Sequence, residues 1–192
     1  MLKRMKVNEI FYSLQGEGHF TGTPAVFVRL ATCNLRCSFC DTDFDEFTEM
    51  SEEEIVSATV QYPASHVVIT GGEPTLQLTT TLVDKLHEAG KYVQIETNGT
   101  NVLPEGCKVD WITCSPKYKA VKIAHIDELK VVYEGQDMSQ YDNLAASEYR
   151  LQPCDTQDAD KNKQIIEQTI DFILRNPKWK LSLQTHKILN VR

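Results

Sequence analysis

Six short runs of β-branched and aromatic residues recur along the chain, and each is separated from the next by a long connection. Strands that alternate with such crossovers pair in parallel, because a tight turn joins only antiparallel neighbours. The recurrence predicts an α/β protein built as a partial (β/α) barrel of about six parallel strands. The expected strands are residues 25–31, 66–70, 92–97, 111–114, 129–133 and 149–152, with edge strands at 7–13 and 180–185.

Helical periodicity is clear in only three segments. The first opens with Ser51 and has Glu54 three residues later, which is the pattern of a capping box. The second ends at Gly90, a residue type favoured after a helix. The connections 100–110 and 117–127 are shorter, so we expect no full helix there and an eroded helical layer. The helical segments are 51–62, 76–90 and 158–176, the last with apolar Ile165, Ile166, Ile170, Ile173 and Leu174.

Length and composition indicate one ordinary globular unit, and we expect a single domain over residues 1–192. Apolar runs such as residues 67–69 are too short to cross a bilayer, and the basic start turns polar before an apolar signal segment forms. We therefore expect a cytoplasmic protein whose six cysteines stay reduced. Acidic residues outnumber basic ones, 27 to 20, without a Lys/Arg stripe, which argues against nucleic acid as a partner.

Polar or glycine-containing segments follow five of the six expected strands. In parallel α/β barrels, the loops after the carboxyl ends of the strands gather on one face and carry the chemistry. The two glycines of TGGEPT favour a close approach of bare backbone to a ligand, and Glu73 adds a charge beside them. SPK and QPCD, taken singly, are also typical of ordinary turns. The five segments are residues 33–42, 70–75, 96–100, 115–117 and 152–155.

The first of these segments, CNLRCSFCDT, contains Cys33, Cys37 and Cys40 within eight positions. Disulfides pair cysteines two by two, and a structural zinc site needs four ligands, so three is the wrong number for both. Three thiolates suit a 4Fe-4S cluster that keeps one iron open for another ligand. The remaining cysteines, Cys107, Cys114 and Cys154, lack such spacing and are expected to be buried, inert thiols, with Cys154 a candidate for lining the site.

The spacing Cys-x3-Cys-x2-Cys, with Phe39 before the last cysteine, resembles the motif of the radical S-adenosylmethionine (SAM) enzymes. The resemblance implies a 4Fe-4S cluster held by Cys33, Cys37 and Cys40, whose unique iron binds SAM. It also implies that the reduced cluster cleaves SAM to methionine and a 5'-deoxyadenosyl radical, while the protein supplies position and excludes water. SAM then accounts for the one iron that the three cysteines leave without a protein ligand.

Within that superfamily the chain resembles the 7-carboxy-7-deazaguanine synthases, which are lyases of queuosine and 7-deazapurine biosynthesis. The resemblance rests on YSLQGEG at 12–18, FVRLATCNLRCSFCDTD at 27–43 and the three motifs TGGEPT, SPK and QPCD, all in the expected order. It implies ring contraction of 6-carboxy-5,6,7,8-tetrahydropterin to 7-carboxy-7-deazaguanine with loss of ammonia, SAM being regenerated. It further implies Mg2+, an electron-donor protein such as flavodoxin or ferredoxin, and a homodimer.

The strand 25–31 places Arg29 on one face together with Phe27, opposite Val26 and Val28. If that face looks into the barrel, the guanidinium needs an anion there, and its planar fork suits a carboxylate. We assign Arg29 to the carboxylate of the substrate. The alternative is a structural ion pair with Glu17 or Glu73.

The resemblance also implies the other site residues, each of which has an ordinary structural alternative. The segment expected to contact the substrate, residues 14–16 and here called the substrate segment, fits a Gly-rich turn between strands as well. Thr42 also fits a cap, and Lys117 also fits a solvated surface charge. Glu17, Glu96 and Asn98 are weaker candidates, and the family leaves His186 and Arg192 without a role. The resemblance implies substrate contacts for Leu14, Gln15, Gly16 and Thr70, SAM contacts for Phe39, Gly72, Ser115, Pro116, Lys117, Gln152, Pro153, Cys154 and Asp155, and Mg2+ at Thr42.

Two rival functions share part of the pattern. A glycyl-radical-enzyme activase has the same cysteine motif and GGEP but acts on a protein, and the segment SLQGEG together with Arg29 argues against it. A non-catalytic Fe-S or zinc-binding module needs none of the SAM motifs, so the presence of all of them argues against that reading as well.

Overall fold

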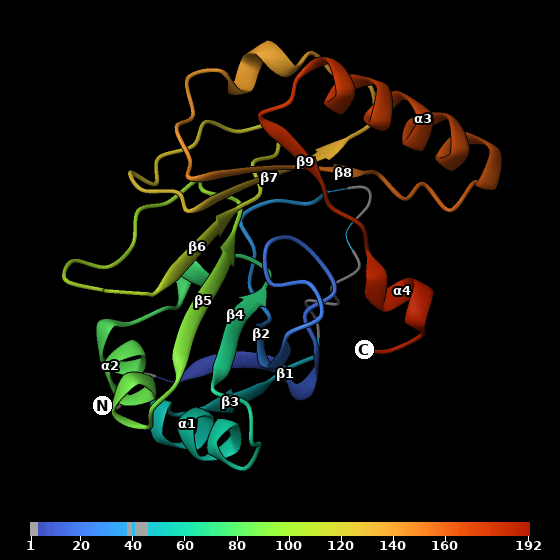
Figure 1. Cartoon of the computed structure of the whole chain (residues 1–192). Coiled ribbons are helices and arrows are strands. Elements are labelled where there is room, and N and C mark those ends of the chain that lie inside the picture. Colours follow the sequence, from blue (N-terminus) through green and yellow to red (C-terminus); the bar gives the residue numbers. More distant parts are fainter. Residues whose placement is uncertain (1–3, 38–39, 41–45) are drawn as a thin grey trace.

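The computed structural model describes residues 4–37, 40 and 46–192, and its described strands form one nine-stranded sheet (Figure 1). The order is β3-β1-β2-β4-β5-β6-β7-β8-β9, with β2 and β4 to β9 parallel and both β1 pairs antiparallel. The strands are β1 Met5–Leu14, β2 Pro24–Leu30, β3 Thr48–Met50, β4 His66–Gly71, β5 Tyr92–Thr97, β6 Trp111–Cys114, β7 Glu128–Tyr133, β8 Glu148–Pro153 and β9 Trp179–Leu181.

The expected parallel strands are confirmed, and none of their ends differs from the sequence-based range by more than one residue. Parallel strands buried on both faces read as continuous apolar runs, which is why they were visible in the sequence. The segment 7–13 is a strand, β1, but the prediction that it lies at the edge of the sheet is wrong, because β3 pairs with its outer side. The segment 180–185 contributes only the end of β9, because Thr185 already begins a short helix.

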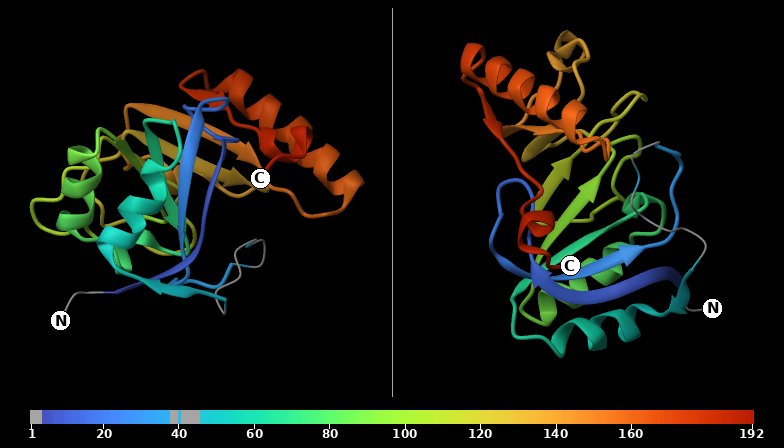
Figure 2. Two further views of the ribbon diagram at one scale, coloured as in Figure 1. Left: turned by 90° about the horizontal axis from the view of Figure 1, so that it is seen from below. Right: turned by 90° about the vertical axis from the view of Figure 1, so that its right-hand side faces the viewer.

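Helices α1, α2 and α3 lie on the outside of the curved sheet (Figure 2), whereas α4 lies at the pocket. Helices α1 and α2 pack on each other beside β1 and β5, and α3 packs on β8 and β9. In the described chain no full helix lies in 100–110 or 117–127, so the expected erosion of the helical layer is confirmed. The helices are α1 Glu52–Val60, α2 Thr80–Glu88, α3 Ala159–Arg175 and α4 Thr185–Leu189, with 3-10 turns η1 Pro74–Leu76 and η2 Met138–Tyr141.

The helix ends follow local sequence signals. The predicted capping box is present, since Ser51 accepts from Glu54 N and the Glu54 side chain accepts from Ser51 N. The prediction of one helix over 76–90 is wrong at its start, because the side chain of Thr79 caps α2 and the preceding residues form η1. The hydroxyl of Thr79 accepts a hydrogen bond from a backbone N–H at the start of α2, and so begins the helix there. Pro74 is favoured at the first position of a helical turn, and η1 begins with it.

The two faces of the sheet differ in chemistry. The outer face packs against the helices through a large apolar cluster that includes Val28, Ile69, Ile95 and Leu129. The inner face has a small apolar cluster around the stacked rings of Phe11 and Phe27, whose centroids are 4.9 Å apart, and is otherwise largely polar. A polar interior leaves the inner face suited to binding a polar ligand.

The loop between β1 and β2 closes one end of the sheet interior. Phe20 packs edge-on against His66 and Trp111, at centroid distances of 4.6 and 5.1 Å. The backbone of the loop is held by side chains of the barrel, because Gly18 N donates to Ser182 Oγ at 3.0 Å and His19 N donates to Glu128 Oε2 at 3.2 Å. In the part of the chain that the structure describes, none of the helices is long and apolar enough to cross a membrane.

We predict that Ser51→Ala destabilises the fold by about 1 kcal/mol, because it removes one half of the capping box and leaves backbone donors of α1 unpaired. Chemical unfolding followed by circular dichroism measures the change. Ser57→Ala is the matched control, because Ser57 is exposed in the middle of α1, where alanine is the better helix former. Equal unfolding midpoints for the Ser51 variant and wild type would contradict the prediction.

Candidate functional site

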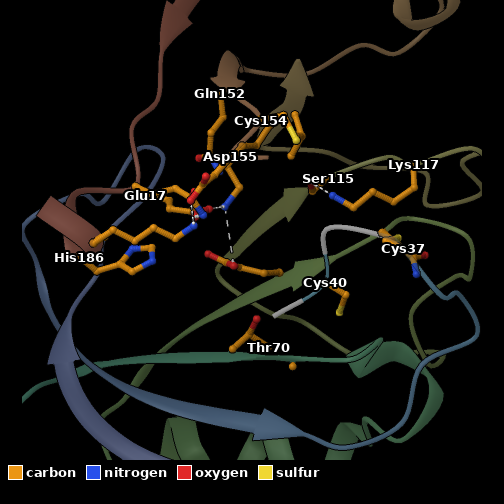
Figure 3. A pocket seen from close by; sticks show the side chains of 18 of the residues that line it. Glu17, Cys37, Cys40, Thr70, Ser115, Lys117, Gln152, Cys154, Asp155 and His186 are labelled. Carbon is orange, nitrogen blue, oxygen red and sulfur yellow. Dashed lines mark hydrogen bonds and ion pairs between the residues drawn. The ribbon is translucent and has the colours of Figure 1, made fainter. Parts of the chain in front are cut away.

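A pocket of about 620 Å³ opens on the face formed by the carboxyl ends of the parallel strands (Figure 3). Its wall also includes the β1–β2 loop and the last residues of the chain. Cys37 and Cys40 lie on one side of the pocket, while Glu17 and His186 lie on the other. The residues expected at the site that line the pocket are Leu14, Gln15, Gly16, Arg29, Cys33, Cys37, Cys40, Thr70, Gly72, Ser115, Lys117, Gln152, Pro153, Cys154 and Asp155.

Three expected residues are not among these. Pro116 lines a smaller neighbouring pocket of about 270 Å³ together with Tyr118 and Tyr141. Its place in the SPK turn still fixes the backbone between Ser115 and Lys117. Phe39 and Thr42 lie outside the described residues, so their predicted roles stay predictions.

The cysteine segment brings its three thiols to one wall of the pocket. Leu35 N donates to Cys33 Sγ at 3.4 Å, and burial raises the pKa of the Cys33 thiol. Within the described residues, no three Cys, His, Asp or Glu side chains lie close enough together to hold a metal ion as they stand. The donor set still fits an iron-sulfur cluster, because three thiols share a wall beside a pocket with room for further ligands. All six cysteines are free.

Glu73 joins the ends of two strands beneath the pocket. Its side chain is fully buried and accepts from Thr75 N at 3.1 Å and from Thr75 Oγ1 at 2.5 Å. It also accepts from Thr97 Oγ1 at 2.6 Å and from Asn98 N at 2.7 Å. The carboxyl group therefore meets donors from both loops, which is the condition for burying so polar a group.

Asparagine side chains connect this assembly to the cysteine segment. Asn98 Nδ2 donates to Asn34 Oδ1 at 3.1 Å, and Asn34 Nδ2 donates to Thr100 Oγ1 at 2.8 Å. Sequence reasoning missed Asn34 and Thr100. Their one signal was that both lie inside motifs already singled out, CNLRC and ETNGT.

The glycines of TGGEPT serve the packing of the strand ends. A Cβ at Gly72 would lie 2.0 Å from the carbonyl oxygen of Thr32, and the backbone N of Gly72 donates to Leu30 O at 2.8 Å. Gly71 has a φ of 110°, in the region that favours glycine. The close approach seen here is to the segment that leads to Cys33, and the approach to a ligand stays a prediction.

The face that alternation gives to Arg29 and Phe27 is the one that lines the pocket, and Thr70 lies beside Arg29 in the register of β2 and β4. Its ion-pair partner is neither Glu17 nor Glu73, so that alternative is wrong in its partners. Arg29 Nε lies 2.9 Å from Glu9 Oε1, and both side chains are partly exposed. Arg192 also pairs with Glu9 from the C-terminus. The alternation rule found the face but not the antiparallel neighbour that supplies the carboxylate.

The segment Gln15–Gly16–Glu17 is both a turn between strands and a wall of the pocket. The turn is closed by Gln15 N, which donates to Thr23 O at 2.8 Å. A Cβ at Gly16 would lie 2.2 Å from Nδ1 of His186, so glycine is needed here for the C-terminal segment to approach. The two readings of the segment are therefore compatible.

A buried cation at the floor of the pocket was missed by sequence reasoning. Lys130, on β7, lies 2.5 Å from Glu17 Oε2 and 3.8 Å from Glu96 Oε2. Burial opposes ionisation of Glu17, but Lys130 and the hydrogen bond from Gln184 outweigh it and lower the pKa of Glu17 to about 2. A lysine in an apolar strand carries no motif, and Glu17 is 113 positions away.

The SPK and QPCD turns form the wall next to the cysteines. Lys117 Nζ donates to Ser115 Oγ at 2.8 Å, and burial, assisted by the charge of Lys130, lowers the pKa of Lys117. Lys117 lines the pocket and is half-buried, so the reading of a solvated surface charge is wrong. Gln152 Oε1 accepts from Ser182 Oγ at 2.9 Å.

Asp155 links the QPCD turn to the C-terminal segment. Its carboxylate lies 2.7 Å from Lys187 Nζ and accepts from Gln157 N at 2.9 Å and Asn162 Nδ2 at 2.8 Å. The bond from Lys187, followed by the other two, holds the pKa of Asp155 well below its usual range. Burial raises the pKa of Cys154, as expected for an inert buried thiol.

Comparisons with known proteins agree with this site. Residues 28–116 match the model of the Radical SAM superfamily. The chain is 55% identical over 189 residues to the 7-carboxy-7-deazaguanine synthase of Bacteroides thetaiotaomicron, covering 97% of this chain and 98% of that one. It is 42% identical over 210 residues to the synthase of Burkholderia multivorans, covering 96% and 98% of the two chains.

Solved structures give the same result. The crystal structure of QueE from Escherichia coli superposes with a TM-score of 0.73, 30% sequence identity and coverage of 94% of both chains. Streptococcus suis SuiB bound to its precursor peptide SuiA gives a TM-score of 0.53 at 14% identity, covering 79% of this chain and 46% of that one, which is a likeness of fold alone. The motifs, the fold and the relatives agree: this chain belongs to the 7-carboxy-7-deazaguanine synthase family of radical SAM enzymes, which implies a 4Fe-4S cluster and SAM.

Proposed function

We propose that the chain converts 6-carboxy-5,6,7,8-tetrahydropterin to 7-carboxy-7-deazaguanine, with loss of ammonia, as a radical SAM lyase of 7-deazapurine biosynthesis. The observation that carries the proposal is the single pocket lined at once by the three cysteines, Arg29 and the Gln15 segment. Full-length relatives named 7-carboxy-7-deazaguanine synthase support it. The C-terminal segment on the pocket wall favours a small molecule over the protein substrate of an activase.

At the cysteine end of the pocket, the chain holds and orients its cofactors. Cys33, Cys37 and Cys40 would hold the cluster, and the cluster with SAM would supply radical chemistry directed at C6 of the pterin. The SAM contacts come from the strand ends. They are the backbone at Gly72, the SPK turn with Ser115, Pro116 and Lys117, the QPCD turn with Gln152, Pro153, Cys154 and Asp155, and Phe39.

At the opposite end, the chain binds the pterin. Arg29 takes the substrate carboxylate, because its planar guanidinium pairs with carboxylates bidentately. Gln15 offers both a donor and an acceptor to the ring edge, with Leu14 and Gly16 beside it and Thr70 next to Arg29. Fixed contacts on both sides hold the reacting carbon toward the cysteine end, which is the main contribution of a protein to such chemistry.

Further parts of the proposal rest on the family resemblance. Thr42 supplies a hydroxyl to Mg2+, whose other ligands come from substrate and water. The electron donor is a flavodoxin or ferredoxin, the enzyme is a cytoplasmic homodimer, and residues 1–192 act as one radical SAM domain.

We predict that the anaerobically reconstituted protein, given reductant, SAM, Mg2+ and 6-carboxytetrahydropterin, forms a product lighter by one ammonia without net consumption of SAM. Mass spectrometry of the product and of SAM checks both statements. Cys37→Ala removes one cluster ligand and should abolish the reaction, whereas Cys107→Ala, outside the pocket lining, is the matched control and should not. Slow cleavage of SAM to 5'-deoxyadenosine with no pterin product would refute the substrate and keep the radical SAM class.

We predict that Arg29→Lys raises the KM for the pterin by roughly tenfold or more, because lysine offers a point charge in place of a bidentate fork. Steady-state kinetics against pterin concentration measure the change. Arg175→Lys is the control, since Arg175 forms an exposed ion pair with Asp171 on α3. An unchanged KM in Arg29→Lys would remove Arg29 from the substrate site.

We predict that Thr42→Ala shifts the Mg2+ concentration for half-maximal turnover upward, by roughly threefold or more, since one protein ligand of a weakly held cation is lost. The measurement is a Mg2+ titration of chelator-treated, reconstituted enzyme. Thr48→Ala, in the exposed start of β3, serves as the control. Identical titration curves for Thr42→Ala and wild type would argue against this ligand.

A further inference from the structure

Lys130 is a buried cation between two carboxylates that come from different parts of the chain. Its side chain is 5% exposed, and its ammonium lies 2.5 Å from Glu17 and 3.8 Å from Glu96. Glu17 belongs to the β1–β2 loop, and Glu96 lies near the end of β5. A third carboxyl group, Glu128, lies on the same strand as Lys130 and raises its pKa as well. The ammonium thus ties the loop to the sheet.

The surrounding groups keep this ion pair charged. Burial disfavours the charge of Lys130, but Glu17, Glu96 and Glu128 outweigh it and hold the pKa of Lys130 above its usual range. Burial raises the pKa of Glu128, and its Oε1 has no hydrogen-bond partner among the described residues. Breaking a buried pair by removal of one partner is costly, because the other charge is left uncompensated.

Glu17 and Glu96 connect Lys130 to the substrate segment through Gln15. Glu17 N donates to Gln15 Oε1 at 3.2 Å, and Gln15 Nε2 donates to Glu96 Oε1 at 3.0 Å. The amide of Gln15 is therefore fixed between the two residues that flank Lys130. Loss of the ammonium would leave two partly buried carboxylates facing each other across Gln15, and their repulsion would move the loop.

The same carboxylate also holds the C-terminal segment, here residues 184–192. Gln184 Nε2 donates to Glu17 Oε1 at 2.8 Å, and the N and Oγ1 of Thr185 both donate to Gly16 O at 2.9 Å. No residue of α4 is buried, and Ile188 and Leu189 are 72% and 58% exposed. The start of the segment is therefore anchored by polar bonds to a loop that Lys130 holds, while Lys187 and Arg192 further along pair with Asp155 and Glu9.

We propose that Lys130 is a positioning residue that acts through Glu17 to hold the substrate segment and the C-terminal segment together at the substrate end of the pocket. The proposal deepens, and in its kinetic part rests on, the proposed function. Lys130 is given no step in the reaction. Its charge sets the conformation of the β1–β2 loop, which contacts the substrate.

The test uses reconstituted enzyme and compares Lys130→Met, Glu17→Gln and the double variant with wild type. Steady-state kinetics give KM and kcat separately, and hydrogen exchange of the C-terminal segment reports whether the Thr185 amide stays bonded to Gly16. Lys85→Met is the matched control, because Lys85 also pairs with two carboxylates, Glu52 and Glu53, but on the surface and outside the pocket lining.

We expect Lys130→Met to raise KM about tenfold or more with a smaller change in kcat, because it disturbs binding more than chemistry. Exchange at Thr185 should become faster, and Lys130→Arg should restore part of both effects. The double variant should be no worse than Lys130→Met alone, since both changes break the same pair. Lys85→Met should behave as wild type.

Additive effects of Lys130→Met and Glu17→Gln on KM would overturn the proposal, because they would show that Lys130 acts independently of Glu17. Unchanged exchange at Thr185 in both single variants would overturn it too. If Lys130→Met does not fold, Glu17→Gln breaks the pair from the other side, and unchanged KM and exchange in that variant would be decisive. Hydrogen exchange needs no turnover, so failure of wild type to form product would refute the proposed function while the exchange data still judge the role of Lys130.

Discussion

The buried carboxyl group of Glu73 is the interaction on which the arrangement of the pocket depends. Its four hydrogen bonds come from Thr75, Thr97 and the backbone of Asn98, so one side chain fixes the ends of β4 and β5. Asn98 then holds Asn34 in the cysteine segment. A polar group with no exposure is stable only with its donors in place. The wall beside the cysteines therefore keeps its shape as one unit, through strand ends that are far apart in the sequence.

The two ends of the pocket are stabilised by different interactions. The cysteine end depends on the hydrogen bonds of Glu73, Asn98 and Asn34 and on backbone packing at Gly72. The opposite end depends on an ion pair, that of Lys130 with Glu17 (Figure 3). Charged groups at one end suit a charged, polar substrate, while thiols at the other suit iron. Lys117 adds a cation beside the cysteines, so charge is present at both ends and the thiols are what sets one end apart.

Much of the fold could be predicted from the sequence because its signals are local. Buried parallel strands are continuous apolar runs, and the capping box of α1 is formed by Ser51 and Glu54, which are close in the sequence. The same rules failed where distant residues decide. The partner of Arg29 is Glu9, which depends on the antiparallel register of β1 and β2. The partner of Lys130 lies 113 positions away, and charge pairs of that kind leave no periodic pattern. The candidate site was found through motifs, and its supporting residues were found only in the structure.

The segments of the pocket wall hold one another in place through side-chain contacts. The β1–β2 loop is held by the barrel, through Ser182, Glu128 and Lys130. The C-terminal segment is held by that loop at Gly16 and Glu17 and by the ion pairs of Lys187 with Asp155 and of Arg192 with Glu9, while no residue of α4 is buried. Segments with little buried apolar surface open at low free-energy cost. The C-terminal segment therefore relies on polar bonds and ion pairs to stay on the pocket wall, whereas the ends of β4 and β5 are joined by the buried bonds of Glu73.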